Sequence, residues 1–217
     1  MDLNTLRIKE PLITHIKAEI YNAFRIYNGY IDPYGPFPYS TPWEDEIIFA
    51  TVLYRFNIPW QRAKDIARGA IDRTERELER WQYAQLYEGV KKILVRLRRS
   101  GILIALATAD LTEIANETLR HVGIADLFDY VVGADMVEND KPHPDMIEKI
   151  VDVLGADKKH TVMVGDSITD MEMGRRADVG LVVGVLEGGV ATRDILAKYA
   201  DVVINSVREI QLFGNPT

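Results

Sequence analysis

The spacing of apolar side chains divides the sequence into an N-terminal part predicted to be helical and a C-terminal part in which strands and helices alternate. Apolar positions recur at helical spacing over residues 12–27, and a loop rich in proline and aromatic residues follows at 32–42. Thr41 and Glu44, with a proline between them, form a capping-box pattern that predicts the start of a second helix. A third helix is expected over 59–81.

From residue 88 onward, short apolar runs alternate with helical stripes. Strands are expected at 102–107, 130–132, 161–164, 179–185 and 201–204. Among the intervening helices, one should start at a capping box of Asp110 and Glu113, one at Pro144, and the last at Ser206. This alternation implies right-handed crossovers and helices on both faces of the sheet. We therefore expect an α/β fold with a doubly wound, mostly parallel sheet.

Composition narrows the class of protein. The 217 residues fit one large domain, or a core with an inserted subdomain, and the net charge of −7 argues against nucleic acid or an anionic membrane as partner. The absence of cysteine excludes disulfides, thiolate metal sites and cysteine nucleophiles. Neither a signal peptide nor an apolar run of roughly 18 residues is present, so a cytoplasmic protein is expected.

Two acidic residues follow the apolar run 161–164. Gly165 ends that run, and Asp166 and Asp170 come next at a spacing of four. Two carboxylates this close repel each other unless a cation or a shared proton intervenes. Oxygen ligands of this kind suit Mg²⁺, which also binds water and phosphate oxygens. The alternative is that Asp166 caps the following helix and Asp170 is merely exposed.

Two further loops carry apt residues after predicted strands. Thr108, with Ala109 beside it, follows the strand 102–107 and offers a hydroxyl and a backbone N–H to an anion; alternatively, it only starts a helix. Lys141 lies in a proline-stiffened loop before a helix, where it can neutralise a phosphoryl oxygen; alternatively, it is an exposed lysine. Because the carboxyl ends of parallel strands meet at one edge of a sheet, these loops and the acidic pair should converge.

A threonine, then Lys-Pro, then Gly-Asp-x-x-x-Asp, each after a strand, resembles the haloacid dehalogenase (HAD) superfamily of phosphatases. The likeness is to its phosphoglycolate phosphatase and β-phosphoglucomutase-like branch. It implies a HAD-like Rossmannoid core at 88–217, a helical cap subdomain at 12–87 and a remnant of the first core motif at 1–11.

The resemblance also assigns roles to residues. It implies that Thr108, with Ala109, and Lys141 bind the transferring phosphoryl group, and that Asp166 and Asp170 hold Mg²⁺ directly or through water. Family chemistry begins with Asp-x-Asp-x-Thr at the end of a central strand. The first Asp attacks phosphorus and the second serves as acid and base.

That first motif is incomplete in this sequence. Asp2 could correspond to the second Asp of the motif, with the nucleophile and its strand lost upstream. It could instead correspond to the first Asp, with one residue deleted after it, or be only a terminal residue. As a catalytic acid it would also bind the metal. Because the family strand is central, we expect a gap beside the strand 161–164, filled by another segment or a partner chain. Weak or no phosphatase activity is expected unless residues precede Met1.

Three functions remain open on sequence alone. The first is a Mg²⁺-dependent phosphatase acting on a small phosphorylated metabolite through an aspartyl-phosphate. The second is a non-catalytic relative that binds such a metabolite or a protein partner. The third is a 2-haloacid dehalogenase, which needs no metal and so leaves the acidic pair unexplained. Neither the substrate nor the oligomeric state follows from the sequence, and a homodimer is among the options.

Overall fold

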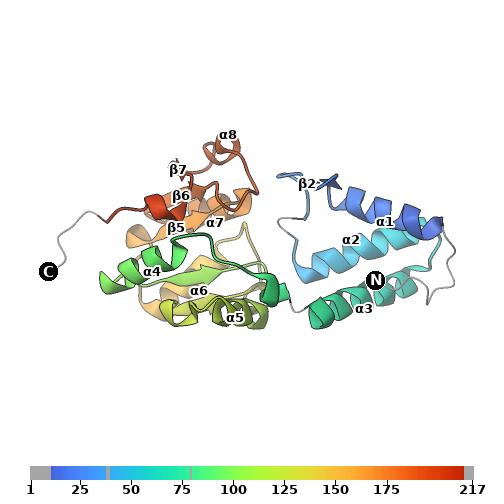
Figure 1. Cartoon of the computed structure of the whole chain (residues 1–217), viewed down its shortest axis with the longest axis horizontal. Helices are drawn as coiled ribbons and strands as arrows, with labels where there is room; N and C mark the ends of the chain where they lie inside the picture. The colour runs from blue at the N-terminus through green and yellow to red at the C-terminus, as the bar shows by residue number, and fades with distance from the viewer. Residues whose placement is uncertain (1–10, 38–39, 79, 213–217) are drawn as a thin grey trace. The chain divides into compact units, whose positions relative to one another are not determined.

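The computed structural model describes residues 11–37, 40–78 and 80–212. The chain forms two compact units, Met1–Arg80 and Trp81–Thr217, each with its own core (Figure 1). Among the described residues, no helix is both long and apolar enough to cross a membrane.

The described part of the first unit contains three helices and a small hairpin. These are α1 (Leu12–Ala23), β1 (Ile26–Tyr27), β2 (Tyr30–Ile31), α2 (Pro42–Arg55) and α3 (Trp60–Leu78). The helices bury one apolar cluster made of Ile13, Ile16, Ala50, Leu53, Ala63 and Ala67. The predicted capping box is confirmed, because the Thr41 hydroxyl accepts from the Glu44 N–H at 3.4 Å and the Glu44 carboxylate accepts from the Thr41 N–H at 2.8 Å.

The helix predicted over 12–27 ends early, which corrects the sequence expectation. Arg25 has a φ of 59°, and its guanidinium binds the Asp32 carboxylate at 2.9 and 2.5 Å. Asn28 and Gly29, with φ values of 51° and 82°, then form the two-residue turn of the β1–β2 hairpin. Residues with positive φ cannot continue a right-handed helix, so the last apolar positions of the stripe belong to a strand instead.

The second unit alternates strands and helices. After η2 (Arg80–Tyr83), which spans the boundary between the units, come α4 (Val90–Arg99), β3 (Ala105–Ala107), α5 (Thr112–His121), η3 (Ala125–Leu127), β4 (Tyr130–Val132), η4 (Ala134–Met136) and α6 (Asp145–Leu154). There follow η5 (Lys158–His160), β5 (Val162–Gly165), α7 (Ile168–Ala177), β6 (Leu181–Val185), α8 (Arg193–Leu196), β7 (Val202–Ile204) and η6 (Val207–Glu209). The α/β class with parallel strands is as expected.

The strands of this unit form two parallel sheets rather than one. β3 pairs with β4, and β5 pairs with β6, which pairs with β7. Within the described chain, no hydrogen bond joins β3 to β5. Among the described residues, β3 and β5 therefore belong to separate sheets, and the gap expected beside the strand 161–164 stays a prediction.

One apolar core serves both sheets. α6 packs on β3, β4 and α7, while α7 packs on β5 and β6 (Figure 1). Val132 from β4, Met146 and Ile147 from α6, and Met173 from α7 are buried in one cluster, and Ala107 of β3 and Met163 of β5 pack against it. The two sheets thus lie on the same layer of helices.

Three local expectations for this unit are wrong. α5 starts at Thr112 without a side-chain cap, because the Thr112 N–H and hydroxyl bind the Asp135 carboxylate at 2.7 and 2.8 Å instead. The last predicted helix is only the short 3₁₀ turn η6 after Ser206. Of the strand predicted at 102–107, only Ala105–Ala107 pairs with another strand. The Ile104 N–H instead donates to the Asp129 carboxylate at 2.8 Å.

Candidate active site

The turn between β5 and α7 places two carboxylates at the carboxyl end of a parallel strand. Ser167 is the N-cap of α7: its hydroxyl accepts from the Asp170 N–H at 3.2 Å and donates to Asp170 Oδ2 at 2.7 Å. Asp170 is only 6% exposed. Asp166 therefore does not cap the helix and Asp170 is not a surface residue, so the plain structural alternative for this pair is wrong.

Two glycines let backbone approach these carboxylates closely. A Cβ on Gly165 would lie 2.4 Å from the Asp170 Cβ, and one on Gly188 would lie 1.7 Å from Asp166 Oδ2. Real side-chain atoms do not approach so closely, so both positions require glycine for the carboxylates to stay where they are. The loop after β6 thus closes over Asp166.

Lys141 reaches the same place from the loop after β4. Its ammonium donates to Asp170 Oδ1 at 2.9 Å, and the two side chains are 14% and 8% exposed. Burial acts to lower the pKa of Lys141, but the neighbouring carboxylates, Asp170 foremost, outweigh it and hold that pKa above its usual value. The lysine is therefore a buried, charged group, not the exposed side chain of the alternative interpretation.

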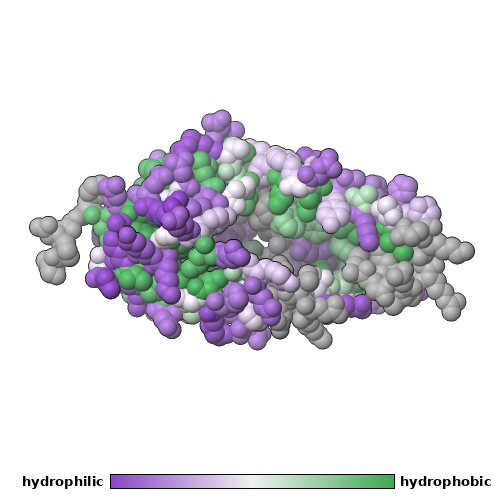
Figure 2. Space-filling model, in the orientation of Figure 1, coloured by the Kyte–Doolittle hydropathy of each residue, from purple (hydrophilic) through white to green (hydrophobic). Residues whose placement is uncertain are grey.

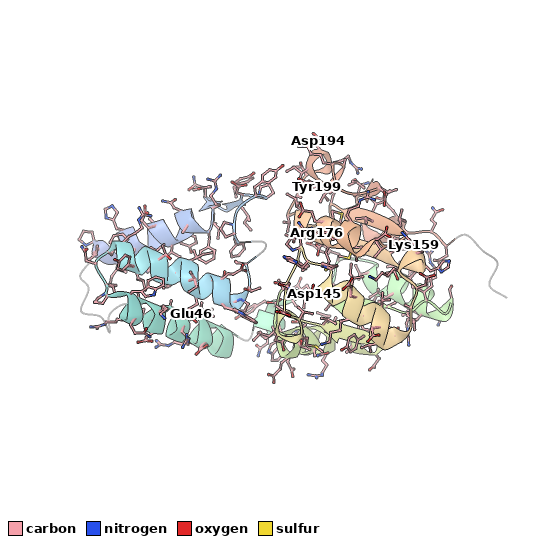
Figure 3. All side chains as sticks on the ribbon, turned by 180° about the vertical axis from the view of Figure 1, so that it is seen from behind. Glu46, Asp145, Lys159, Arg176, Asp194 and Tyr199 are labelled. Atoms are coloured by element: carbon pink, nitrogen blue, oxygen red, sulfur yellow. The ribbon has the colours of Figure 1, made fainter. Side chains whose placement is uncertain are left out.

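The loop that carries Lys141 is tied at both ends. Asp145, the first residue of α6 (Figure 3), accepts from the Asn139 N–H at 3.1 Å and from the Asn139 side-chain amide at 3.0 Å. The Asp140 carboxylate accepts from the Lys141 N–H at 2.6 Å. These bonds fix the backbone from which the lysine extends, so the loop is preorganised.

The environment of Asp166 favours a cation beside it. Burial raises the pKa of Asp166, and the negative charge of Asp170 raises it further, against the opposing charge of Lys141. A divalent cation next to Asp166 would offset both effects, because it stabilises the charged form of the carboxyl group. Both oxygens of Asp170 already accept hydrogen bonds from Lys141 and Ser167, so Asp166 is the better direct ligand of the pair.

Thr108 lies at the end of β3, as predicted, but its backbone is used differently. The Thr108 N–H donates to the Val132 carbonyl at 3.0 Å, so it is not offered to an anion. The hydroxyl oxygen accepts from the Asp110 N–H at 3.1 Å, which leaves its proton to donate. Ala109 follows it in the same turn. Among the described residues, no hydrogen bond or ion pair links Thr108 directly to Lys141 or the acidic pair.

The remaining predicted ligand, Asp2, lies outside the described residues. Within 11–37, 40–78 and 80–212, no group of three or more acidic or histidine side chains is clustered to hold a metal. The donors present are the two carboxylates, and the remaining positions on a metal would be taken by water, phosphate or a further acid. That donor set suits Mg²⁺.

Sequence reasoning missed Ser167 and Asp140, although the first had a signal. Ser167 and Asp170 have the spacing of a capping box, the same pattern that predicted α2. Asp140 carried no such signal, because a carboxylate next to a lysine in a loop is usually solvated. Its role depends on the fold of the loop.

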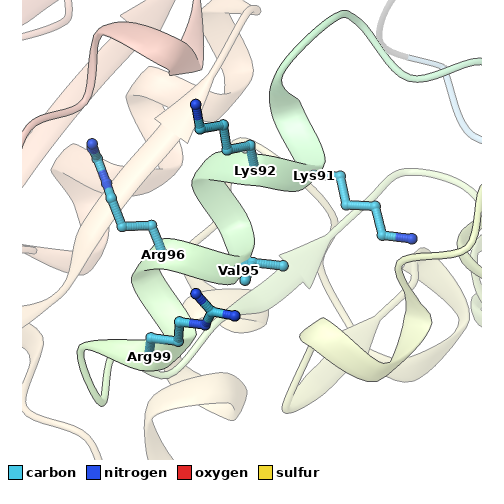
Figure 4. Close-up of a pocket in the computed structure, with 5 residues that line it drawn as sticks. All are labelled: Lys91, Lys92, Val95, Arg96 and Arg99. Atoms are coloured by element: carbon cyan, nitrogen blue, oxygen red, sulfur yellow. The ribbon is translucent and has the colours of Figure 1, made fainter.

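A shallow cavity of about 480 Å³ lies elsewhere, against α4, and is lined by Lys91, Lys92, Val95, Arg96 and Arg99 (Figure 4). Two of its cations have structural partners, since Lys91 donates to the Gly123 carbonyl at 2.8 Å and Arg96 donates to the Ile210 carbonyl. All five residues come from one helix, so no second element converges on the cavity. We do not assign it to the active site.

The sequence pattern of the haloacid dehalogenase-like hydrolase family matches residues 49–184, more than half of the chain. The chain belongs to this family. Its α/β unit with Asp166, Asp170 and Lys141 at the carboxyl ends of parallel strands is thus a HAD-type core.

Curated relatives of this HAD protein are named as phosphatases. The pyrophosphatase PpaX of Halalkalibacterium halodurans is 34% identical over 125 residues, which cover 57% of each chain. The phosphoglycolate phosphatase of Yersinia pseudotuberculosis is 33% identical over 129 residues, 56% of each chain. The chain spans a little over half the length of the curated relatives it matches.

Solved structures share the fold. A haloacid dehalogenase-like hydrolase from Bacteroides fragilis superposes with a TM-score of 0.66 at 21% identity, covering 91% of this chain and 90% of that one. The β-phosphoglucomutase of Clostridium difficile gives a TM-score of 0.63 at 20% identity, with coverage of 79% and 73%. At these identities the likeness establishes the fold alone.

Proposed function

We propose that this chain carries the phosphate- and metal-binding half of a Mg²⁺-dependent phosphatase acting on a small phosphorylated metabolite. The observation that carries the proposal is the Lys141 ammonium 2.9 Å from Asp170, with Asp166 beside them, at the carboxyl ends of parallel strands. Open α/β sheets bind ligands at that edge. The names of the curated relatives support a phosphorylated substrate.

Each residue has a role that follows from its position. Asp166 would ligate Mg²⁺, and Asp170 would hold it through water while keeping Lys141 in place. Lys141 would neutralise charge on the phosphoryl oxygens, and the Thr108 hydroxyl would donate to one of them. When bound, Mg²⁺ would supply further stabilisation of the charge on the transferring group.

The nucleophile is not among these residues. In a phosphatase of this class, a carboxylate attacks phosphorus, the ester P–O bond breaks, and a second acid protonates the leaving oxygen. Water then attacks the aspartyl-phosphate and releases inorganic phosphate, which restores the carboxylate. Asp2 is the candidate for one of the two acids. Uncatalysed hydrolysis is so slow that up to ~10²¹-fold acceleration is needed, so binding groups alone give little turnover.

Metal binding is tested by titrating the full chain with Mg²⁺ in the presence of inorganic phosphate and following the heat released. Asp166→Asn should weaken Mg²⁺ binding by about tenfold or more. Asp178→Asn is the matched control, because this acid lies at the opposite end of α7 with its side chain 79% exposed. Equal Mg²⁺ affinity in all three proteins would refute the metal site.

Activity is tested with a panel of phosphomonoesters, with and without Mg²⁺. The 217-residue chain should turn over weakly or not at all. A form extended at its N-terminus by an apolar strand ending in Asp-x-Asp should be active and should lose activity with chelator. Ordinary turnover by the unextended chain would refute the requirement for an added nucleophile.

In the part of the chain that the structure describes, β3 is not joined to β5, which favours a second candidate, a non-catalytic relative that binds a phosphorylated metabolite. It makes the same Mg²⁺ and phosphate contacts but gives no turnover in either form. Binding of inorganic phosphate without turnover by the extended form would select this candidate. A 2-haloacid dehalogenase would release halide without metal, which the same panel can include.

A further inference from the structure

The helix that follows the Thr108 turn, α5, begins without a cap of its own. Its N-cap residue is Leu111, whose side chain offers no acceptor to the first N–H groups of the helix. The acceptor comes from Asp135 instead, whose carboxylate accepts from the Thr112 N–H at 2.7 Å and from the Thr112 hydroxyl at 2.8 Å. Asp135 lies 23 positions further along the chain, in η4, so this cap depends on the tertiary fold.

Thr112 is bound to the same segment a second time. Its hydroxyl oxygen accepts from the Gly133 N–H at 3.0 Å, while its hydroxyl proton goes to Asp135. A Cβ on Gly133 would lie 2.4 Å from the Thr112 nitrogen and 2.6 Å from Asp135 Oδ1. Only glycine allows this approach, so the start of α5 and the segment after β4 are in close contact.

The segment after β4 also holds the turn that carries Thr108. The Ala134 N–H donates to the Asp110 carbonyl at 3.1 Å, and the Thr108 N–H donates to the Val132 carbonyl at 3.0 Å. The Asp110 N–H in turn donates to the Thr108 hydroxyl oxygen at 3.1 Å. Because a hydroxyl has a single proton, which this bond does not use, the position of Asp110 determines where that proton can be donated.

The same segment continues into the loop of Lys141. The Met136 carbonyl at the end of η4 accepts from the Lys149 ammonium at 2.7 Å, which anchors the segment to α6. Among the described residues, no hydrogen bond joins Thr108 to Lys141 directly. The segment 132–136 therefore sets their relative position, because the Thr108 turn is bound to it and the Lys141 loop extends from it.

The plain interpretation of Asp135 is a solvated surface acid. Hydrophilic residues dominate the surface of the second unit that Figure 2 shows, with apolar areas between them, and most side chains of this kind need only water. Asp135 differs because Thr112 donates to it twice. Partial burial acts to raise the pKa of Asp135, but these hydrogen bonds outweigh it and hold that pKa below its usual value. The carboxylate is therefore held in place.

We propose that Asp135 is a positioning residue of the active site, which acts through Thr112 and the Thr108 turn to fix the Thr108 hydroxyl relative to Lys141. The inference rests on the proposed function, because it requires that Thr108 and Lys141 bind the same phosphoryl group. Asp135 would itself touch neither phosphate nor metal. Donors that are already in place bind an anion more tightly, because the anion does not have to order them.

The test titrates the full chain with inorganic phosphate at saturating Mg²⁺ and follows the heat released. Asp135→Ala removes the acceptor from Thr112 and should weaken phosphate binding by about fivefold or more. Asp135→Asn is the conservative variant, because its side-chain oxygen can still accept from Thr112. Phosphate affinity in Asp135→Asn should stay within about twofold of the unaltered chain.

The matched control is Asp129→Ala, because Asp129 joins the same two strands at their opposite end. Its carboxylate accepts from the Ile104 N–H at 2.8 Å and binds the Arg98 guanidinium. The substitution should lower the midpoint of thermal unfolding but leave phosphate affinity within about twofold. A merely structural role for Asp135 predicts instead that the two alanine variants bind phosphate alike.

A double-mutant cycle tests whether Asp135 acts through Thr108. Thr108→Val removes the hydroxyl that would donate to phosphate. In that background, Asp135→Ala should weaken phosphate binding by less than about twofold more, since no hydroxyl remains to be positioned. Thr112→Val should reproduce part of the loss seen in Asp135→Ala, whereas Thr112→Ser keeps the hydroxyl and should not. This second pair decides the matter in the same way if Asp135→Ala does not fold.

Three results would overturn the inference. They are unchanged phosphate affinity in Asp135→Ala, an equal loss in Asp129→Ala, and strict additivity with Thr108→Val. If phosphate affinity is unchanged in Asp135→Ala but falls in Lys141→Met, the proposed function stands and only this role of Asp135 is lost. If the unaltered chain binds no phosphate, the proposed function fails and this inference fails with it.

Discussion

Replacing Lys141 by methionine should destabilise the second unit, because it leaves two buried carboxylates without their cation. The substitution keeps the length and apolar stem of the side chain and removes only the ammonium. Asp170 is 8% exposed on its side chain and lies beside Asp166, so neither charge is well screened by water.

The magnitude follows from the geometry. Opposite unit charges 2.9 Å apart attract by about 6 kcal/mol at an effective dielectric constant of ~20. Desolvation offsets part of this, and removing one partner of a buried pair typically costs about 3–5 kcal/mol. Because Ser167 still donates to Asp170 Oδ2 at 2.7 Å, the lower end, about 3 kcal/mol, is expected.

Unfolding in urea measures this loss. Trp81 belongs to the second unit, so its fluorescence reports on that unit once Trp43 and Trp60 are changed to phenylalanine. The double variant Lys141→Met/Asp170→Asn should be more stable than the sum of the single changes predicts, by about 2 kcal/mol, since Asp170 no longer carries a charge without its partner and only the Asp166 carboxylate remains. Mg²⁺ should restore part of the stability lost in Lys141→Met.

The matched control is Lys159→Met. Lys159 (Figure 3) binds Asp178 at 2.6 Å, but the two side chains are 62% and 79% exposed, so the urea midpoint should not move. A Lys141→Met midpoint equal to that of Lys159→Met would contradict the burial argument. Strict additivity in the double variant would show that Lys141 and Asp170 are not coupled.

Three further changes test packing, capping and an acid that binds the start of a helix, each by urea or thermal unfolding. Gly174→Ala should cost about 1–3 kcal/mol, because the added Cβ would lie 2.9 Å from the Met163 Cβ; an unchanged midpoint would mean that α7 shifts freely. Thr41→Ala should cost the first unit about 1 kcal/mol, and no loss there would deny the capping box a stabilising role. Burial raises the pKa of Asp135, but the Thr112 N–H and hydroxyl outweigh it and the pKa lies below its usual value. Because the pKa of Asp135 is lower in the folded than in the unfolded chain, its carboxylate stabilises the fold above a pH of ~4, and this contribution is lost as the pH falls. Asp135→Asn should therefore cost less than about 1 kcal/mol at pH 7 and nothing at pH 2. A larger cost at pH 2 than at pH 7 would contradict this prediction.

Local patterns of sequence were sufficient for much of the fold. The capping box at Thr41 depends on two residues three apart, so it forms wherever the chain folds. The turn at Asn28 and Gly29 had an equally local signal, an Asn-Gly pair, which the longer helical stripe concealed. The alternation of strands and helices after residue 88 was enough to predict parallel strands.

The candidate site was predictable only in part. Thr108, Lys141, Asp166 and Asp170 stand out because each follows a strand, and the topology of parallel strands sends such residues to one edge. The use of the Thr108 N–H by Val132 could not be predicted, because a ladder extends or stops according to its partner strand.

The sequence by itself determined the helix starts with local caps, the α/β class and the residue types gathered at one edge of the sheets, since each rests on spacing along the chain. Only the tertiary structure decided that Asp135 binds the start of α5 and that Lys141 is buried against Asp170. These depend on contacts between residues 20 or more positions apart, whose energies are set by burial and by the neighbouring strand rather than by local sequence.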